Sequence, residues 1–159
     1  MTEAMPNGEL RHLAAQFIDL RIHSCAQAWP ILGRDVSMLD EDGPAGSLLY
    51  ACRTDAAMAN PMGIVHGGVT ASLVDTCMGV TCSSQCGRVA TPTVTMTVNY
   101  ARPVPLDAVI HVRVHTVRIG TTSAQMRAEV FLPEKADEPL VTASGVYAIR
   151  RSAPQPGKT

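Results

Sequence analysis

The chain has 159 residues, of which 46% are hydrophobic and 17% charged, and its formal net charge at pH 7 is −1. These values indicate one globular domain with a sizeable core, and they argue against a disordered chain and against a nucleic-acid-binding protein. The sequence has no apolar run long enough to span a bilayer and begins without the features of a secretory signal, so we expect a cytoplasmic protein that does not enter membranes.

The predicted elements follow from hydrophobic spacing and from the turn residues between them. An amphipathic helix is expected over residues 7–21, and one long helix over residues 66–85, closed by Gly87. Strands are expected over residues 35–39, 47–53, 91–100, 108–119, 123–132 and 140–149. Short connections favour antiparallel neighbours, and the largely apolar long helix needs a cover. We therefore predict an α+β fold in which a curved antiparallel sheet wraps around one long central helix.

The five cysteines do not form the pattern of a disulfide framework or of a metal site. Their number is odd and a cytoplasmic setting is reducing, so free thiols are expected. Cys82 and Cys86 are four residues apart and share a helix face, but zinc needs about four ligands and no second Cys or His pair has a typical spacing. We expect no bound metal and interpret these thiols as apolar packing residues.

The segment from Asn60 to Asp75 carries the clearest chemical signal. It is a loop that passes through His66, Gly67 and Gly68 into the long helix, with one carboxylate about two turns later. A helix N-terminus offers unpaired N–H groups and a partial positive charge, which suit the oxygen of a polarised carbonyl. A nearby acid is a candidate base or nucleophile, so the segment predicts acyl chemistry.

The predicted long helix has two different faces. Placed at 100° steps, its apolar face consists of Val69, Leu73, Cys77 and Val80, and its opposite face of Ser72, Asp75, Thr76, Gly79 and Ser83. A solvent-exposed helix face normally carries Lys, Glu or Arg, and this helix has none of them. The small polar face indicates a partner surface or a pocket. The alternative is an Asp75 that faces water and is stabilised by the helix dipole.

Residues 66–79 resemble the central-helix signature of hotdog-fold acyl-CoA thioesterases, and are most similar to the subgroup of phenylacetic-acid-degradation and 4-hydroxybenzoyl-CoA thioesterases. The resemblance extends over residues 60–63, 91–103 and 120–123 and covers about residues 45–149. It implies a hotdog domain over residues 34–150, preceded by an N-terminal helical extension over residues 1–33 and followed by a flexible tail over residues 151–159. It also implies a homodimer, often paired again into a homotetramer, with active sites at the subunit interface.

The resemblance implies hydrolysis of a small or medium acyl- or aryl-CoA to the free acid and CoA. The N–H of Gly67 polarises the thioester carbonyl, and Asp75 of the facing subunit acts as general base or as nucleophile, two roles that the sequence does not separate. Asn60 orients the carbonyl or the water, Thr93 helps to hold the water, and His66 contacts the thioester or caps the helix. No cofactor is expected, because coenzyme A is part of the substrate.

Contacts to the rest of the substrate are predicted along the helix and at a later turn. On the helix, the predicted substrate contacts are Gly68, Ser72, Met78 and Gly79. The candidate phosphate site is the later turn, which contains Arg118, Gly120 and Thr121. Weaker phosphate candidates are Arg88, Arg102 and Arg150. Many relatives carry a hydroxyl one turn after the acid, where this chain has Gly79, so that hydroxyl is absent or is supplied elsewhere.

Each assignment has a structural alternative. His66 can serve only as a cap, Asn60 only as a turn residue before a proline, and Thr93 only as a strand former. Two alternative functions also stand beside the thioesterase: a non-catalytic acyl-CoA binding protein, and a hotdog dehydratase. The dehydratase usually needs an Asp and a His in one motif, and no such pattern follows Asp75.

Overall fold

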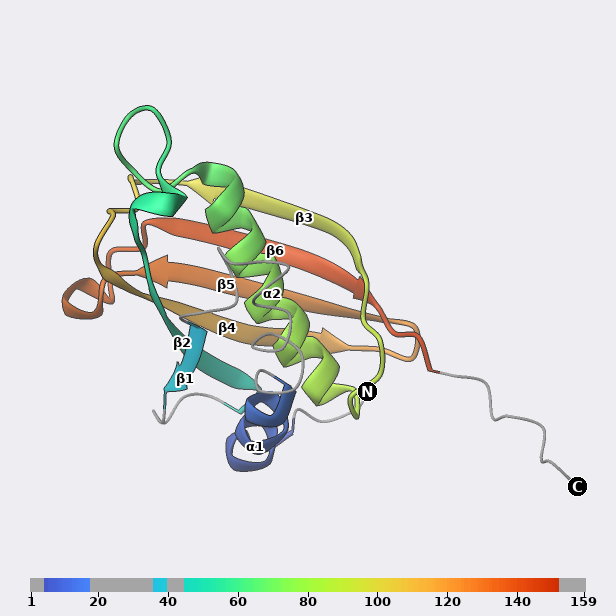
Figure 1. Ribbon diagram of the computed structural model, residues 1–159. Helices are drawn as coiled ribbons and strands as arrows, with labels where there is room; N and C mark the ends of the chain where they lie inside the picture. The colour runs from blue at the N-terminus through green and yellow to red at the C-terminus, as the bar shows by residue number, and fades with distance from the viewer. Residues whose placement is uncertain (1–4, 18–35, 40–44, 152–159) are drawn as a thin grey trace, which may run out of the picture.

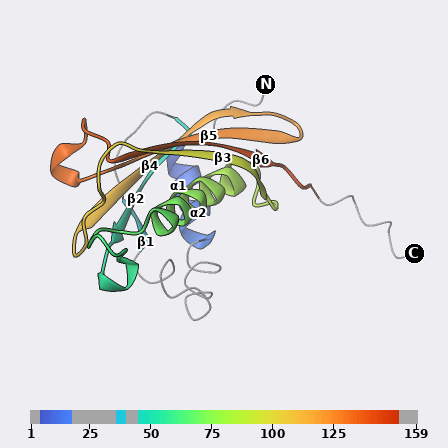
Figure 2. The ribbon, with the colours of Figure 1, turned by 90° about the horizontal axis from the view of Figure 1, so that it is seen from above.

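The computed structural model describes residues 5–17, 36–39 and 45–151. A six-stranded antiparallel sheet curves around the long helix α2 (Gly67–Gln85), which crosses its concave face (Figures 1 and 2). In sheet order the strands are β1 (Val36–Leu39), β2 (Ser47–Arg53), β4 (Val109–Ile119), β5 (Ser123–Phe131), β6 (Val141–Ala148) and β3 (Thr93–Tyr100). Two short 3-10 helices, η2 (Ala56–Met58) and η3 (Pro133–Lys135), lie in the connections. The predicted α+β arrangement and all the predicted strands are confirmed.

The core lies between α2 and the concave face of the sheet. The alternation in β4 is confirmed, because Ile110, Val112 and Val114 are all buried. The two predicted faces of α2 are also largely confirmed: Leu73, Cys77 and Val80 are buried, whereas Ser72, Asp75, Thr76 and Gly79 are half-buried. Ser83 corrects the prediction. It is buried, because the chain after α2 folds back and the Ser83 hydroxyl donates to the Val89 carbonyl at 2.8 Å.

Helix α1 (Asn7–Phe17) packs against α2 and β2 and places Leu10 and Ala14 in the same core. It was predicted to reach residue 21, but residues 18–35 lie outside the described part of the chain. Residues 1–4, 40–44 and 152–159 also lie outside it. The division into an extension over residues 1–33, a domain over residues 34–150 and a tail over residues 151–159 therefore stays a prediction.

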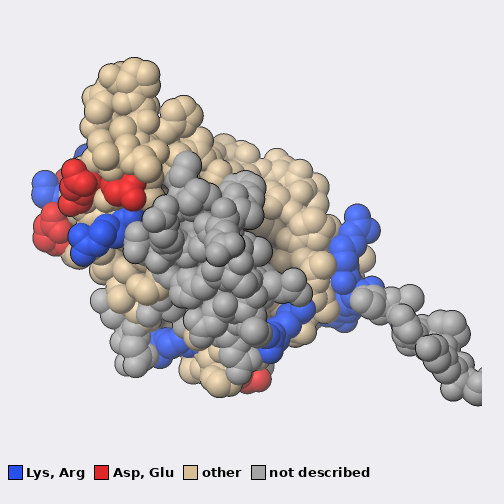
Figure 3. Space-filling model, viewed as in Figure 1, with Lys and Arg blue, Asp and Glu red and all other residues tan. Residues whose placement is uncertain are grey.

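Among the described strands, β3 forms one edge of the sheet and pairs only with β6. Its sequence, TVTMTVNY, contains no charged residue, and it exposes 65% of Val94 and 52% of Tyr100. The tan surface over β3 in Figure 3 accordingly carries no charged side chains. An open, uncharged edge of this kind is a template for pairing with another chain.

The described thiols are free, as predicted: Cys52, Cys77 and Cys82 are buried and Cys86 is half-buried. Cys25 lies outside the described residues. Within the described ranges, no three His, Cys, Asp or Glu side chains gather as a metal site. None of the described helices has the length and apolar character needed to cross a membrane.

Gly145 and Gly79 leave space on either side of the Tyr147 ring and should respond oppositely to an added methyl group. A Cβ at Gly145 lies 3.0 Å from Tyr147 Cε2, whereas a Cβ at Gly79 lies 3.8 Å from Tyr147 Cε1. We predict that Gly145→Ala lowers the free energy of unfolding by about 1–3 kcal/mol through overpacking. Gly79→Ala should raise it by about 0.5–1 kcal/mol, because alanine favours the helix. Urea denaturation followed by circular dichroism measures both, and equal effects would contradict the packing described.

Candidate active site

The loop before α2 holds the Asn60 side chain in place. Asn60 Oδ1 accepts hydrogen bonds from the backbone N–H groups of Met62 at 2.9 Å and Ile64 at 3.4 Å, and an isolated bridge pairs Ala59 with Val65. Asn60 is therefore a turn residue, as the structural alternative proposed. Its side-chain NH2 group has no partner among the described residues, so a fixed donor stays available beside the helix start.

His66 caps the N-terminus of α2 and leaves one backbone donor open. Its backbone is extended, and its Nδ1 accepts from the Gly68 N–H at 2.9 Å. The His66 carbonyl accepts from Val69 and Thr70. Within the described residues, the Gly67 N–H has no acceptor. The ring nitrogen that accepts carries no proton, so a neutral His66 bears its proton on Nε2.

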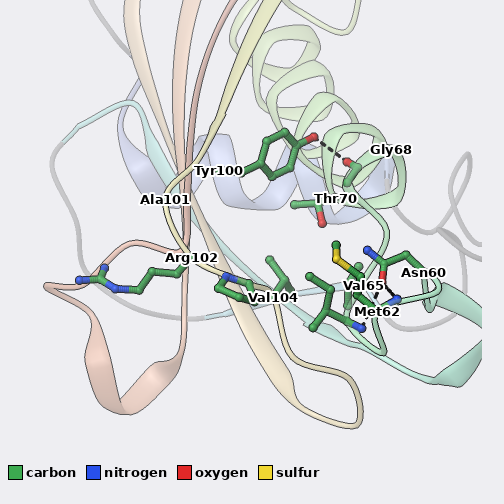
Figure 4. Close-up of a pocket in the computed structure, with 12 residues that line it drawn as sticks. Asn60, Met62, Val65, Gly68, Thr70, Tyr100, Ala101, Arg102 and Val104 are labelled. Carbon is green, nitrogen blue, oxygen red and sulfur yellow. Dashed lines mark hydrogen bonds between the residues drawn. The ribbon is translucent and has the colours of Figure 1, made fainter.

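Gly67 and Asn60 line a first pocket of about 480 Å³ (Figure 4). The Tyr100 hydroxyl donates to the Gly67 carbonyl at 2.7 Å, and the Tyr100 ring lies 3.4 Å from the place where a Cβ on residue 67 would stand. A Cβ at this distance would make ordinary van der Waals contact, so the Tyr100 ring packs against residue 67 without excluding a methyl group. The other lining residues are largely apolar and include Met62, Ile64, Val65 and Val104.

Asp75 lines a second pocket of about 670 Å³ together with Thr93 and Tyr147. Asp75 Oδ1 accepts two hydrogen bonds, from the Thr93 hydroxyl at 2.8 Å and from the Tyr147 hydroxyl at 2.9 Å. Thr93 and Tyr147 are direct partners on β3 and β6, next to a β-bulge between Thr93 and Thr95. Bulges often redirect a side chain beside a functional site. Among the described residues, Asp75 Oδ2 has no hydrogen-bond partner.

The two pockets are separate within one chain and share no lining residue. Gly67 and Asp75 lie eight residues apart on the same helix, which corresponds to about 12 Å along its axis. The structure thus brings Asn60, Gly67 and Gly68 together at the helix start, and Asp75 and Thr93 together farther along. A single chain thus has a half with the open Gly67 N–H and a half with the Asp75 carboxylate, and the two do not meet.

The other predicted contacts on the helix have different surroundings. Gly79 lines the second pocket. The Ser72 hydroxyl donates to the Gly68 carbonyl at 2.8 Å, and Ser72 lines neither pocket. Met78 corrects the prediction, because it is fully buried in the core. Its side chain packs against β6, where a Cβ at Gly145 would lie 3.3 Å from Met78 Cε.

The arginines are distributed differently from the prediction. Arg118, Gly120 and Thr121 lie in the β4–β5 hairpin and line neither pocket, and the Gly120 N–H is occupied by the Ser123 carbonyl. Arg88 and Arg150, the weaker candidates, are exposed and line the pocket of Asp75. Basic side chains gather at this end of the molecule, where β6 ends, in Figure 3. Arg102 lines the first pocket, and its guanidinium donates to the Pro139 carbonyl.

The sequence reasoning missed the two tyrosines that contact the key groups. Tyr147 is four positions after Ala143 and two after Gly145 in a strand whose alternate residues are buried, so its inward direction was predictable. The contact of its hydroxyl with Asp75 was not, because it depends on how α2 crosses β6. Tyr100 ends β3, and its contact with Gly67 likewise joins elements that are distant in the sequence.

Comparison with known proteins relates the chain to one family. A model of the thioesterase superfamily matches residues 62–138, from the loop before α2 to the connection after β5. Over this part of its sequence the chain is similar to the thioesterase superfamily. A search of curated protein sequences gives no match.

Solved structures share the fold of this chain, which is the hotdog fold that was predicted. The PaaI protein of the phenylacetic acid degradation operon of E. coli is 22% identical, with a TM-score of 0.71 over 89% of this chain and 96% of its own. A conserved protein of Pseudomonas aeruginosa is 27% identical, with a TM-score of 0.65 over 77% and 93%. A Streptococcus mutans protein solved with acetyl-CoA bound is 18% identical, with a TM-score of 0.65 over 74% and 90%.

The hydrogen bond from the Gly68 N–H to the His66 side chain should stabilise the start of α2. His66→Ala removes the acceptor of the Gly68 N–H and should lower the free energy of unfolding by about 1 kcal/mol. His66→Asn is the matched control, because asparagine is among the preferred N-cap residues and should retain most of that stability. Chemical denaturation measures both variants. An alanine variant as stable as the asparagine variant would show that the cap contributes nothing.

Proposed function

We propose that this protein hydrolyses acyl-CoA thioesters in a site built by two copies of the chain. One observation carries the proposal: the Gly67 N–H at the start of α2 has no acceptor among the described residues and lies at an apolar pocket, and a half-buried Asp75 lies farther along the same helix. A helix N-terminus with an open N–H suits the oxygen of a thioester carbonyl.

In the proposed reaction the thioester carbonyl oxygen lies against the Gly67 N–H. The amide of Asn60 provides a second donor at the same pocket, and the helix dipole favours the negative charge that develops on the oxygen. One donor of this kind contributes about 10²–10³ in rate. The apolar lining of the first pocket suits a small or medium acyl group.

Asp75 supplies the second half of the chemistry through Oδ2. As a general base it takes a proton from water, which then attacks the thioester carbon and expels the CoA thiolate. As a nucleophile it attacks the carbon itself and forms a mixed anhydride that water later opens. Either route ends in a free acid and CoA and needs no cofactor, since coenzyme A arrives as part of the substrate.

The separation of the two halves supports a dimer. An Asp75 that is about 12 Å along the helix from Gly67 of its own chain needs a second chain to reach a carbonyl held by Gly67. The open, uncharged edge of β3 lies beside α2 and suits pairing with the same strand of a second copy. A homodimer, or a pair of such dimers as a homotetramer, is therefore the assembly we propose.

Two observations support coenzyme A as part of the substrate. The Streptococcus mutans relative was solved with acetyl-CoA, and a hypothetical thioesterase of Streptococcus pneumoniae with coenzyme A. In this chain, Arg88 and Arg150 are exposed at the pocket of Asp75, where guanidinium groups suit phosphates. We propose these arginines, in place of Arg118 and its hairpin, as the phosphate contacts.

A thiol-release assay tests the activity. Wild-type protein should release CoA from at least one of acetyl-, phenylacetyl-, hydroxybenzoyl- and longer acyl-CoA, and Asp75→Asn should lower kcat by about 10²–10⁴ with a smaller effect on binding. Asp107→Asn is the matched control: Asp107 is exposed, lines neither pocket and has a positive φ of 53° that asparagine also adopts.

Two outcomes of this assay would redirect the assignment. Near-normal turnover by Asp75→Asn would reject the role of Asp75. Tight binding of acyl-CoA by the wild-type protein without turnover of any substrate would replace the enzyme by an acyl-CoA binding protein.

A purified heterodimer tests whether the site is shared. One chain carries Asp75→Asn and a differently tagged chain carries Asn60→Ala, and each homodimer should be impaired. If every site combines the first pocket of one chain with Asp75 of the other, the heterodimer contains one intact site and should recover about half of the wild-type activity. If each chain builds its own site, both sites stay damaged and no activity returns. A stable, active monomer in sedimentation would also reject the shared site.

A further inference from the structure

We infer that Tyr147 is a positioning residue that holds Asp75 so that only one carboxylate oxygen faces the reacting groups. The inference rests on the proposed function for the role of Asp75 in turnover. The Tyr147 hydroxyl lies 2.9 Å from Asp75 Oδ1 and 3.3 Å from the Asp75 backbone carbonyl. A carboxylate only accepts hydrogen bonds, so the phenol is the donor.

The Tyr147 ring is held tightly enough to act as a fixed support. It is 1% exposed and lies between α2 and β6. A Cβ at Gly145 would lie 3.0 Å from one edge of the ring, and Gly79 lies beside the other edge. No bulkier residue than glycine fits at 145 without displacing the ring or Met78. Gly145 thus gives the ring the space through which its hydroxyl reaches Asp75.

The hydroxyl stays a donor across the working pH range of the protein. Burial raises the pKa of the Tyr147 phenol well above its ordinary value, and the negative charge of Asp75 raises it further. The phenol therefore keeps its proton and does not act as an acid or a base towards the substrate. Its contribution is to orient Asp75.

Two hydroxyls on the same oxygen leave the other oxygen open. Thr93 and Tyr147 both donate to Asp75 Oδ1, whereas Oδ2 has no partner among the described residues. Thr93 is exposed on the edge strand β3, while Tyr147 is buried on the interior strand β6. Tyr147 is thus the rigid member of the pair. Without it, Asp75 is free to turn about its side-chain bonds with only the Thr93 contact to restrain it.

Tyr147→Phe tests the inference, because it removes the hydroxyl and keeps the ring. We expect kcat to fall about 10-fold while KM stays within about twofold, since the variant weakens the placement of Asp75 and not the binding of substrate. Tyr50→Phe is the matched control. Tyr50 is also fully buried, and its hydroxyl is 2.7 Å from Thr81 Oγ1 on the same helix, away from both pockets.

The control separates positioning from general stability. Both variants lose one buried hydrogen bond and should lose similar stability in urea denaturation, but Tyr50→Phe should keep kcat within about twofold of wild type. A Tyr147→Phe variant with wild-type kcat would overturn the inference. So would an equal loss of kcat in both variants, because the loss would then follow stability and not the contact with Asp75.

A crystal structure of the Tyr147→Phe variant tests the inference independently of the proposed function. We expect the Asp75 carboxylate to be rotated or to occupy two rotamers, with Oδ1 displaced from its wild-type place. If the wild-type protein hydrolyses no acyl-CoA, the proposed function fails and this structure alone decides the inference. An Asp75 side chain in its wild-type rotamer would then overturn it.

Discussion

The hydrogen bond from the Gly68 N–H to His66 Nδ1 is the interaction on which the site depends. A helix begins with several backbone donors that have no intrahelical acceptor. The His66 side chain accepts from the Gly68 N–H, and the His66 carbonyl accepts from the N–H groups of Val69 and Thr70. Among the described residues, the Gly67 N–H is therefore the one donor of the first turn that has no acceptor. The first turn of α2 is therefore rigid and still has one donor to offer.

The same helix packs in the core and lines both pockets because its two faces differ. Its apolar face is covered by the curved sheet, which fixes its position relative to β6 and β3. The opposite face carries small residues, so that larger groups from the strands reach it: Tyr100 reaches Gly67 at one end and Tyr147 passes Gly79 to reach Asp75.

Much of the fold was predictable from the sequence because its signals are local. The alternation in residues 108–119 and 123–132 is a property of neighbouring residues, and the glycines and prolines between them mark the turns. The family resemblance placed Asp75 and Thr93 in one site, but it did not predict the hydrogen bond between them within one chain. Gly87, with its positive φ of 78°, ends the helix where its residue type indicated.

The positions that were predicted wrongly or missed depend on contacts between residues that are distant in the sequence. Ser83 lies on the predicted polar face, yet the chain that follows α2 covers it. Met78 has the chemistry of a tunnel residue, but the curvature of the sheet places it in the core. Arg88 and Arg150 lie 62 positions apart in the sequence and meet at the pocket of Asp75 only because β6 ends beside the C-terminus of the helix.

The backbone N–H and C=O groups on the outer edge of β3 pair with no other described strand, and this has a consequence for a newly made chain. Proteins usually guard such a strand with lysine, proline or a covering loop, and any of these would also repel a correct copy. β3 carries no charged residue, so in the proposed dimer the protection against random aggregation depends on how fast a second copy pairs with the strand after folding. Crowded expression, in which many unpaired copies coexist with unfolded chains, is the condition under which that protection is weakest.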